Sequence, residues 1–90
     1  GLGLVLIEAA SCGLPLISYD CPSGPSEIIT DGKNGYLIPK VGDIEMMANR
    51  ICKLIEDVDL RKQMGKNAKL MVDKFSPAKI KEQWITLLTH

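Results

Sequence analysis

The sequence has no excess of charge of either sign, because eleven lysine and arginine residues are balanced by eleven aspartate and glutamate residues. Proteins that bind nucleic acid usually carry a basic surplus. We therefore expect no nucleic-acid partner. The sequence also lacks any apolar run near the length of about 20 residues that a membrane-spanning helix needs, and no signal peptide is recognisable at its start.

Cysteine is scarce as well. Cys12, Cys21 and Cys52 are odd in number and widely separated, so they form neither a disulfide framework nor a metal-ligand spacing. This usage fits a reducing compartment, and we expect a cytoplasmic location. Ninety residues are enough for one small domain with a modest core. Because the chain begins without Met and in the middle of a motif, we expect it to be a fragment of a longer protein.

The first thirteen residues, GLGLVLIEAASCG, are the most informative stretch. Their apolar run fits a buried strand or a buried helix, but the Glu-Ala-Ala-Ser-Cys part favours a helix over residues 4–12 with Gly13 as its C-cap. Gly1 and Gly3 then form a turn in front of the helix. Such a helix start can bind an anion, since the N–H groups and the helix dipole both point outward. Glu8 lies about one turn inside, and a charge among apolar neighbours is seldom buried without a partner.

The next part of the chain alternates short apolar segments with loops. Pro15 precedes the segment Leu16–Tyr19, which we predict to be a strand, since proline is tolerated at a strand entry. Four further segments follow from the positions of glycine, proline and apolar residues: a loop at 20–25, a short helical turn at 26–30, a turn at 31–35 and a second strand at 36–38.

From residue 43 onward the pattern is helical. Asp43 is the predicted N-cap of one helix, Asp59 of a second, and Ser76 followed by Pro77 begins a third. Apolar residues at helical spacing form one stripe on each helix. The stripes consist of Ile44, Met47, Ile51, Leu54, Ile55 and Val58; of Leu60, Met64, Ala68, Met71, Val72 and Phe75; and of Ile80, Trp84, Leu87 and Leu88.

This order of elements predicts the α/β fold class. Strands that alternate with helices predict a partial Rossmann-like unit, with parallel strands and flanking helices, over residues 1–40. A helical C-terminal tail follows over residues 43–90. Two strands are too few to cover the apolar faces of these helices. We therefore expect further strands upstream, in the other half of a Rossmann-like domain.

Four motifs within residues 1–38 also resemble, in the same order, those of retaining GT-B-type glycosyltransferases of the glycogen-synthase-like group 1 kind. Glu8 and the residues before it are similar to the family's Glu-Gly-Phe-Gly-Leu, three residues and a second Glu. The first glutamate would precede Gly1 and is absent, and Leu2 stands where Phe is usual. The other three motifs begin at Cys12, Ser26 and Asp31: CGLPLI is similar to Cys-Gly-x-Pro-Val-Ile, SEII to Pro-Glu-Ile-Ile, and DGKNG to Asp-Gly-x-Asn-Gly.

The resemblance implies that residues 1–90 are the C-terminal portion of a nucleotide-sugar-binding donor domain. It assigns Glu8 to the ribose hydroxyls, and a carboxylate suits them because its hydrogen bonds are charge-assisted. The donor-binding residues that it implies are Glu8, Gly1, Leu2, Gly3, Leu4 and Val5, with the amides of the last three facing the diphosphate. Ser23 and Gly24 could approach the donor or belong to a plain loop. No catalytic nucleophile or base is identifiable, and such enzymes are similar in needing no metal or other cofactor.

The implied activity is transfer of a sugar, with retention, from a nucleotide-diphosphate sugar to a glycan or lipid-linked acceptor. Uridine diphosphate is the default carrier. The implied setting is polysaccharide or glycoconjugate synthesis in the cytoplasm, at the inner face of the membrane. The missing N-terminal domain would hold the acceptor. We expect the isolated fragment to be inactive, because the first glutamate, the upstream basic residues and the acceptor domain are absent.

Two other interpretations stay open. A dinucleotide-binding module has the fingerprint G-x-G-x-x-G, which Gly1 and Gly3 fit, but Leu6 replaces the third glycine. A non-catalytic interaction fragment would offer its apolar helix faces to partners, and self-association would be expected of it. Tight NAD binding without nucleotide-sugar binding would favour the first. Unchanged stability and association in Glu8→Ala, with no nucleotide binding, would favour the second.

Overall fold

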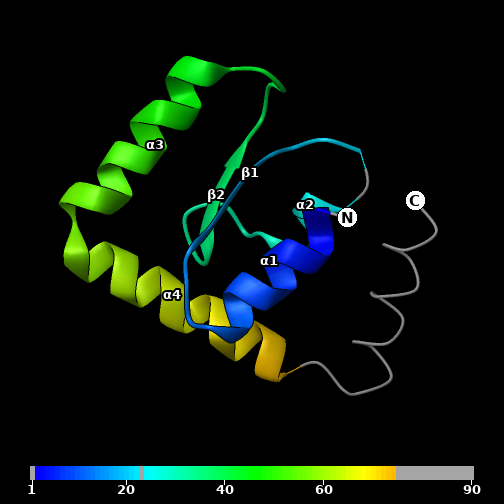
Figure 1. The fold of residues 1–90 in the computed structure, drawn as a ribbon, viewed down its shortest axis with the longest axis vertical. Coiled ribbons are helices and arrows are strands. Elements are labelled where there is room, and N and C mark those ends of the chain that lie inside the picture. Colours follow the sequence, from blue (N-terminus) through cyan, green and yellow to red (C-terminus); the bar gives the residue numbers. More distant parts are fainter. Residues whose placement is uncertain (1, 23, 75–90) are drawn as a thin grey trace.

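The computed structural model describes residues 2–22 and 24–74. Six elements follow one another along these residues: α1 (Leu2–Ser11), β1 (Leu16–Tyr19), α2 (Pro25–Ile28), β2 (Gly35–Ile38), α3 (Ile44–Glu56) and α4 (Val58–Asp73) (Figure 1). The predicted third tail helix and Phe75 lie outside the described residues. None of the helices in these two ranges is long and apolar enough to cross a membrane.

The two strands pair in parallel, which confirms the predicted α/β arrangement. Leu16 lies opposite Gly35, and Tyr19 lies opposite Ile38. The Asp20 amide extends the ladder by donating to the Ile38 carbonyl over 2.8 Å. A Cβ at Gly35 would overlap the backbone of Leu16. The close approach at this end of the sheet therefore requires glycine.

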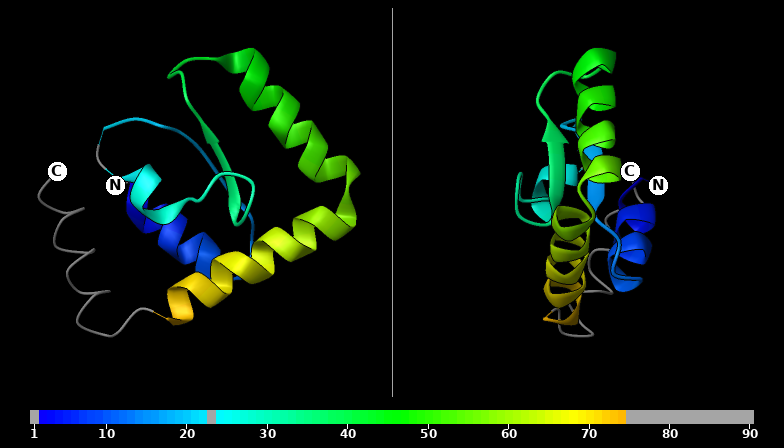
Figure 2. Two further views of the ribbon diagram at one scale, coloured as in Figure 1. Left: turned by 180° about the vertical axis from the view of Figure 1, so that it is seen from behind. Right: turned by 90° about the vertical axis from the view of Figure 1, so that its left-hand side faces the viewer.

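The sheet separates two clusters of buried apolar residues. The first is formed with α1, α2 and the C-terminal half of α4, and contains Leu6, Ile7, Ala10, Leu16, Ile28, Ile29, Ala68 and Val72. The second is formed with α3 and the N-terminal half of α4, and contains Tyr36, Ile38, Leu54 and Met64. Leu37 packs against the first cluster while its two neighbours in β2 belong to the second, because successive side chains of a strand point to opposite faces. Figure 2 shows α4 running along one end of the strands, from the α3 side to the α1 side.

Helix α1 begins earlier than predicted, at Leu2, so that Gly3 lies in the helix and not in a turn before it. The cost of about 1 kcal/mol for one glycine is small beside the helix-forming residues that follow. The predicted C-cap is confirmed: Gly13 has φ +74°. The Gly13 amide donates to the Ala10 carbonyl over 3.0 Å, and the Leu14 amide donates to the Ala9 carbonyl over 3.1 Å. This pair of hydrogen bonds is the Schellman motif.

The short helix α2 is shifted by one residue from the predicted start at 26. It begins at Pro25 because a proline ring already holds the φ angle of a first helical residue. It ends before Ile29, which has the extended φ of −94° and ψ of 123°. The turn that follows at residues 31–35 is present as predicted.

The N-cap predicted for α3 is correct, and the one predicted for α4 is not. Asp43 caps α3 as predicted, its side chain accepting from the Met46 amide over 3.1 Å. The prediction of Asp59 as the cap of α4 is wrong. Asp57 takes this role and accepts from the Leu60 amide over 3.0 Å. Because α3 ends one residue before Asp57, the single connecting residue caps both helices, and Asp59 falls inside the first turn.

The apolar stripe predicted on the first tail helix is largely exposed. Leu54 is buried and Met47 packs against the second cluster. The remaining four members are exposed: Ile44, Ile51, Ile55 and Val58. The stripe of α4 is different, since three of its members are buried: Met64, Ala68 and Val72. Two strands offer α3 a surface narrower than its stripe, as the sequence led us to expect.

Candidate functional site

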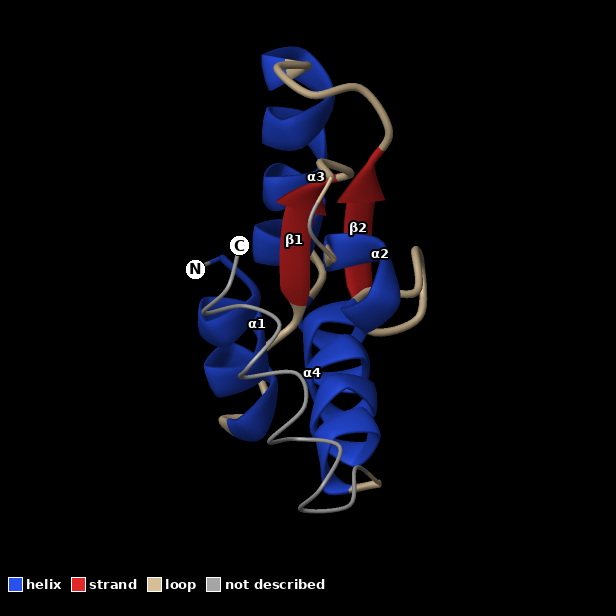
Figure 3. Cartoon of the chain, turned by 90° about the vertical axis from the view of Figure 1, so that its right-hand side faces the viewer, coloured by secondary structure: helices blue, strands red, loops and turns tan. Residues whose placement is uncertain are grey.

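The first turn of α1 lies toward the end of the sheet where β1 stops. The short connection at residues 12–15 makes α1 run antiparallel to β1, so α1 begins nearer the end of this strand than it finishes (Figure 3). We call this the carboxyl end of the sheet, and the other the amino end. In open α/β sheets, ligands bind outside the carboxyl ends of the strands. The first turn of α1, which contains four of the predicted donor-binding residues, therefore lies toward the favoured end.

The backbone of this first turn suits an anion. Amides in the first turn of a helix have no carbonyl acceptor within it, and here they belong to Leu2, Gly3, Leu4 and Val5. The dipole adds about half a positive charge at this end. No acidic residue lies in the first turn of α1 to offset it. The sequence predicted that the helix starts at residue 4, two residues later than observed. The amides predicted to face the diphosphate, those of Gly3, Leu4 and Val5, nevertheless belong to the first turn.

Glu8 lies on the exposed face of α1. The opposite face is held by Leu6, Ile7 and Ala10, which belong to the first cluster. Val5 lies one turn before Glu8 on the same side, and 59% of its surface is exposed. Within the part of the chain that the structure describes, the Glu8 carboxylate makes no hydrogen bond and no salt bridge. No described residue therefore occupies the accepting positions of its oxygens.

The loop after β1 reaches the same end. Gly24 has φ +108° and precedes α2, and its carbonyl accepts from the Glu27 amide over 3.0 Å. Helix α2 packs against α1, and Figures 1 and 2 draw it beside the N-terminal end of α1. The structure therefore brings Gly24 to the carboxyl end together with the first turn of α1. Gly1 and Ser23 lie outside the described residues. The donor-binding roles of all these residues stay predictions.

Sequence reasoning missed the function of Asn34, which is structural. Its buried side chain accepts from the Thr30 amide over 2.8 Å and donates to the Ile28 carbonyl over 2.9 Å. It also donates to the sulfur of Met71 over 3.3 Å, which ties the turn to α4. The sequence signal was its fixed place in the Asp-Gly-x-Asn-Gly motif. Over residues 2–22 and 24–74, no three His, Cys, Asp or Glu side chains are grouped so that they could hold a metal ion.

Comparison with known proteins identifies the family. The sequence model of the family described as "Glycosyl transferases group 1" matches residues 1–71. The chain is similar to a solved structure titled "Crystal Structure of TarM", with a TM-score of 0.79 and 36% identity, over 98% of this chain and 18% of that one. The α/β fold predicted from the sequence is therefore also that of a solved group 1 relative.

Two curated relatives agree with this match over nearly the whole chain. A Staphylococcus aureus poly(ribitol-phosphate) alpha-N-acetylglucosaminyltransferase is 38% identical over 97% of this chain and 18% of its own length. An exopolysaccharide phosphotransferase of Streptomyces coelicolor is 38% identical over 97% of this chain and 9% of its own length. The chain thus spans less than a fifth of either relative. The resemblance drawn from the four motifs is confirmed: the chain belongs to the family of group 1 glycosyl transferases.

Proposed function

We propose that this chain is the nucleotide-sugar-binding part of a retaining glycosyltransferase. The reaction is transfer of a sugar from a nucleotide-diphosphate sugar, with uridine diphosphate as the carrier, to a glycan or lipid-linked acceptor. The setting is polysaccharide or glycoconjugate synthesis in the cytoplasm, at the inner face of the membrane. The acceptor is held by another domain of the longer protein. The observation that carries the proposal is the exposed Glu8 on a helix whose first turn lies at the carboxyl end of a parallel sheet.

Each part of the donor has a matching group on α1 or in the loop after β1. The amides of Gly3, Leu4 and Val5 provide donors for the diphosphate, aligned with the positive end of the α1 dipole. The Glu8 carboxylate accepts from the two vicinal ribose hydroxyls, and each hydrogen bond is charge-assisted. The backbone around Gly24 borders the same space.

The chemical contribution of these residues is electrostatic. When the glycosidic bond to the donor breaks, negative charge grows on the leaving diphosphate. Helix amides that are already aimed at this charge stabilise it without reorganising during the reaction. Glu8 fixes the position of the nucleoside and so the position of the anomeric carbon. The proposal requires no metal ion and no nucleophile from this chain.

The test is Glu8→Ala in the longer protein that carries this chain, titrated with a uridine diphosphate sugar. Loss of a charge-assisted ribose contact costs about 1.5–3 kcal/mol, so the Kd should rise by about one to two decades. Isothermal titration calorimetry measures the Kd, and circular dichroism verifies that folding is unchanged.

The matched control is Glu56→Ala. Glu56 is also an exposed glutamate on a helix, but it lies at the last position of α3. Its substitution by alanine removes the same charge as Glu8→Ala. Its variant should bind the donor like wild type. Equal affinity in wild type and Glu8→Ala would show that Glu8 has no part in the donor site. Tight binding of NAD with no binding of the nucleotide sugar would favour a dinucleotide-binding module instead.

We further propose that the chain is inactive as an isolated fragment. The basis is the absence from this sequence of the first family glutamate and of an acceptor-binding domain. Purified residues 1–90 are incubated with a radiolabelled nucleotide sugar and an acceptor. Detectable sugar transfer above a no-protein blank would contradict this part of the proposal.

The exposed stripe of α3 supports a last proposal, that the isolated chain self-associates. Ile44 and Ile55 are 75% and 63% exposed, and they lie on one face with Ile51. Apolar patches of this kind favour association in water. Sedimentation velocity should show a concentration-dependent rise in mass for wild type, and Ile55→Lys should reduce it. A monomer at all concentrations would contradict self-association.

A further inference from the structure

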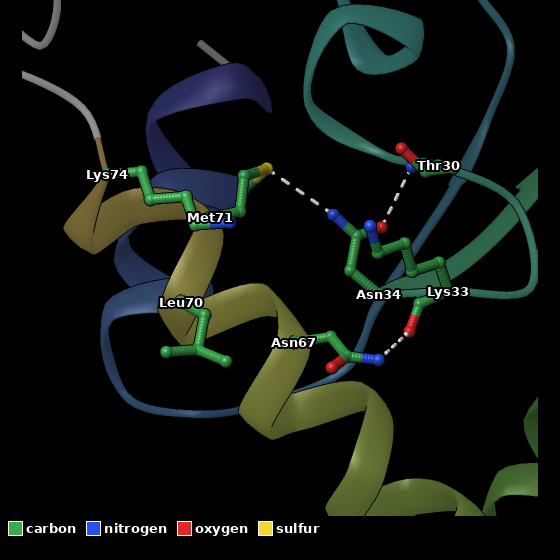
Figure 4. Close-up of a pocket in the computed structure, with 7 residues that line it drawn as sticks. All are labelled: Thr30, Lys33, Asn34, Asn67, Leu70, Met71 and Lys74. Carbon is green, nitrogen blue, oxygen red and sulfur yellow. Dashed lines mark hydrogen bonds between the residues drawn. The ribbon is translucent and has the colours of Figure 1, made fainter.

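A cavity of about 260 Å³ opens at the amino end of the sheet. It lies between the turn at residues 30–34 and the last turns of α4, and Figure 4 draws the residues that line it. The described residues that line it belong to the turn and to α4, and none of them lies in α1. The cavity is thus no part of the candidate donor site, and nothing in the proposed function uses it.

The lining of this cavity is positively charged. Lys33 contributes an ammonium group from the turn, and Lys74 contributes another from the end of α4. Thr30 also lines the cavity, from the turn side. Among the described residues that line it there is no aspartate or glutamate. Two like charges on facing walls repel each other, and an anion between them removes that repulsion.

Two hydrogen bonds hold the walls together. The side-chain amide of Asn67 in α4 donates to the Lys33 carbonyl over 2.8 Å. The side-chain amide of Asn34 donates to the sulfur of Met71 over 3.3 Å. Figure 4 shows both contacts crossing from the turn to α4. The cavity is therefore formed before any ligand enters, and little ordering of its walls is needed on binding.

One effect opposes an anion here. The C-terminal end of α4 carries about half a negative charge from its last carbonyl groups. The Leu70 carbonyl is already engaged, since it accepts from the Lys74 amide over 3.2 Å. Two full positive charges outweigh half a negative one, so the local field still favours an anion.

We propose that this cavity binds a phosphate group, supplied by inorganic phosphate or by a small organic phosphate monoester. A phosphate carries nearly two negative charges and three acceptor oxygens, enough for both ammonium groups at once. Leu70 and Met71 provide an apolar wall beside these groups. This wall suits the carbon part of an organic monoester.

The test is titration of the full chain with inorganic phosphate and with glycerol 3-phosphate at constant ionic strength, followed by isothermal titration calorimetry or amide chemical shifts. Lys33→Ala and Lys74→Ala should each weaken binding about tenfold, because each removes one charge-assisted contact. Lys33→Ala keeps the backbone carbonyl to which Asn67 donates, so the wall itself is preserved.

Lys62→Ala is the matched control, since it removes an equal charge from an exposed position on α4 that does not line the cavity. It should change the affinity less than about twofold, because exposed charges are screened by salt. If all three variants weakened phosphate binding equally, the effect would come from the loss of net charge and not from the cavity, and the proposal would be overturned. Saturable binding that neither cavity variant changes would place the phosphate elsewhere, for example at α1, and would also overturn it. If only the two cavity variants weaken binding, the affinities of the two ligands are compared. Tighter binding of glycerol 3-phosphate than of inorganic phosphate assigns the cavity to an organic monoester, and equal affinity for the two assigns it to phosphate alone.

Discussion

The turn before β2 and the exposed face of α1 use their polar side chains in opposite ways. At the amino end, the Asn34 side chain is buried and every one of its hydrogen-bonding contacts is to this chain. On the exposed face of α1, the Glu8 carboxylate lies in solvent, and in the described structure it makes no such contact. A polar group that is satisfied internally stabilises the fold, whereas one left in solvent costs little and stays available for a ligand. Asn34 and Glu8 therefore differ in the role expected of them, and substitutions of these two residues should have different consequences.

The largest expected effect is at Gly65, in the close contact between α4 and the connection after α1. A Cβ here would overlap the carbonyl oxygen of Gly13. Helix propensity alone predicts that Gly65→Ala stabilises by about 1 kcal/mol. We expect the steric effect to exceed this and the variant to lose about 3 kcal/mol of unfolding free energy, measured by urea denaturation.

The adjacent variant Lys66→Ala serves as the control, because Lys66 is exposed and should change stability by less than about 0.5 kcal/mol. An increase in stability for Gly65→Ala would show that α4 can move away from Gly13 at little cost. The close packing between α1 and α4 would then not be a requirement of the fold.

Asn34→Ala tests the amino end directly. It leaves the Ile28 carbonyl and the Thr30 amide without their side-chain partner. An unpaired buried group costs about 1–3 kcal/mol, so we expect a loss of about 2–3 kcal/mol in chemical denaturation. Asn49→Ala is the control, since that exposed side chain accepts one hydrogen bond, from Arg50. Equal midpoints for the two variants would contradict a structural role for Asn34.

Asp57→Ala has an intermediate expected effect, at the corner between α3 and α4. Loss of an N-cap costs about 1 kcal/mol, and Asp57 accepts from the Leu60 amide. Asp59→Ala should cost less, because Asp59 contributes only a favourable charge in the first turn of α4. Thermal unfolding followed by circular dichroism compares the two. A larger loss of thermal stability for Asp59→Ala than for Asp57→Ala would indicate that Asp59 is the N-cap, as the sequence predicted.

The smallest effect on stability is expected at Glu8, on the exposed face of α1. Glu8→Ala removes an exposed carboxylate with no described contact and should change the unfolding free energy by less than about 0.5 kcal/mol. The same variant is expected to lose most of its donor affinity. A substantial loss of stability would mean that Glu8 supports the fold, and the contrast between Glu8 and Asn34 would disappear.

Much of the secondary structure could be predicted because its causes are local. The strand Leu16–Tyr19 follows from an apolar run after a proline, and the end of α1 at Gly13 follows from the need for positive φ. The family could also be predicted, because its motifs are contiguous stretches of sequence. The helix start at Leu2 was missed by two residues, since the apolar run tolerates Gly3 in the first turn.

What the sequence by itself determined is thus the order and kind of the elements, the caps at Gly13 and Asp43, and the four motifs, all of which depend on residues within a few positions of one another. Only the tertiary structure decided the roles of Asn34 and Gly65 and the exposure of the α3 stripe. Asn34 meets Met71 across 37 residues of sequence, and Asn67 meets Lys33 across 34. Such contacts arise from how α4 lies against the turn and against α1. No periodicity or local spacing encodes that placement, because it depends on which buried surfaces meet when the elements pack.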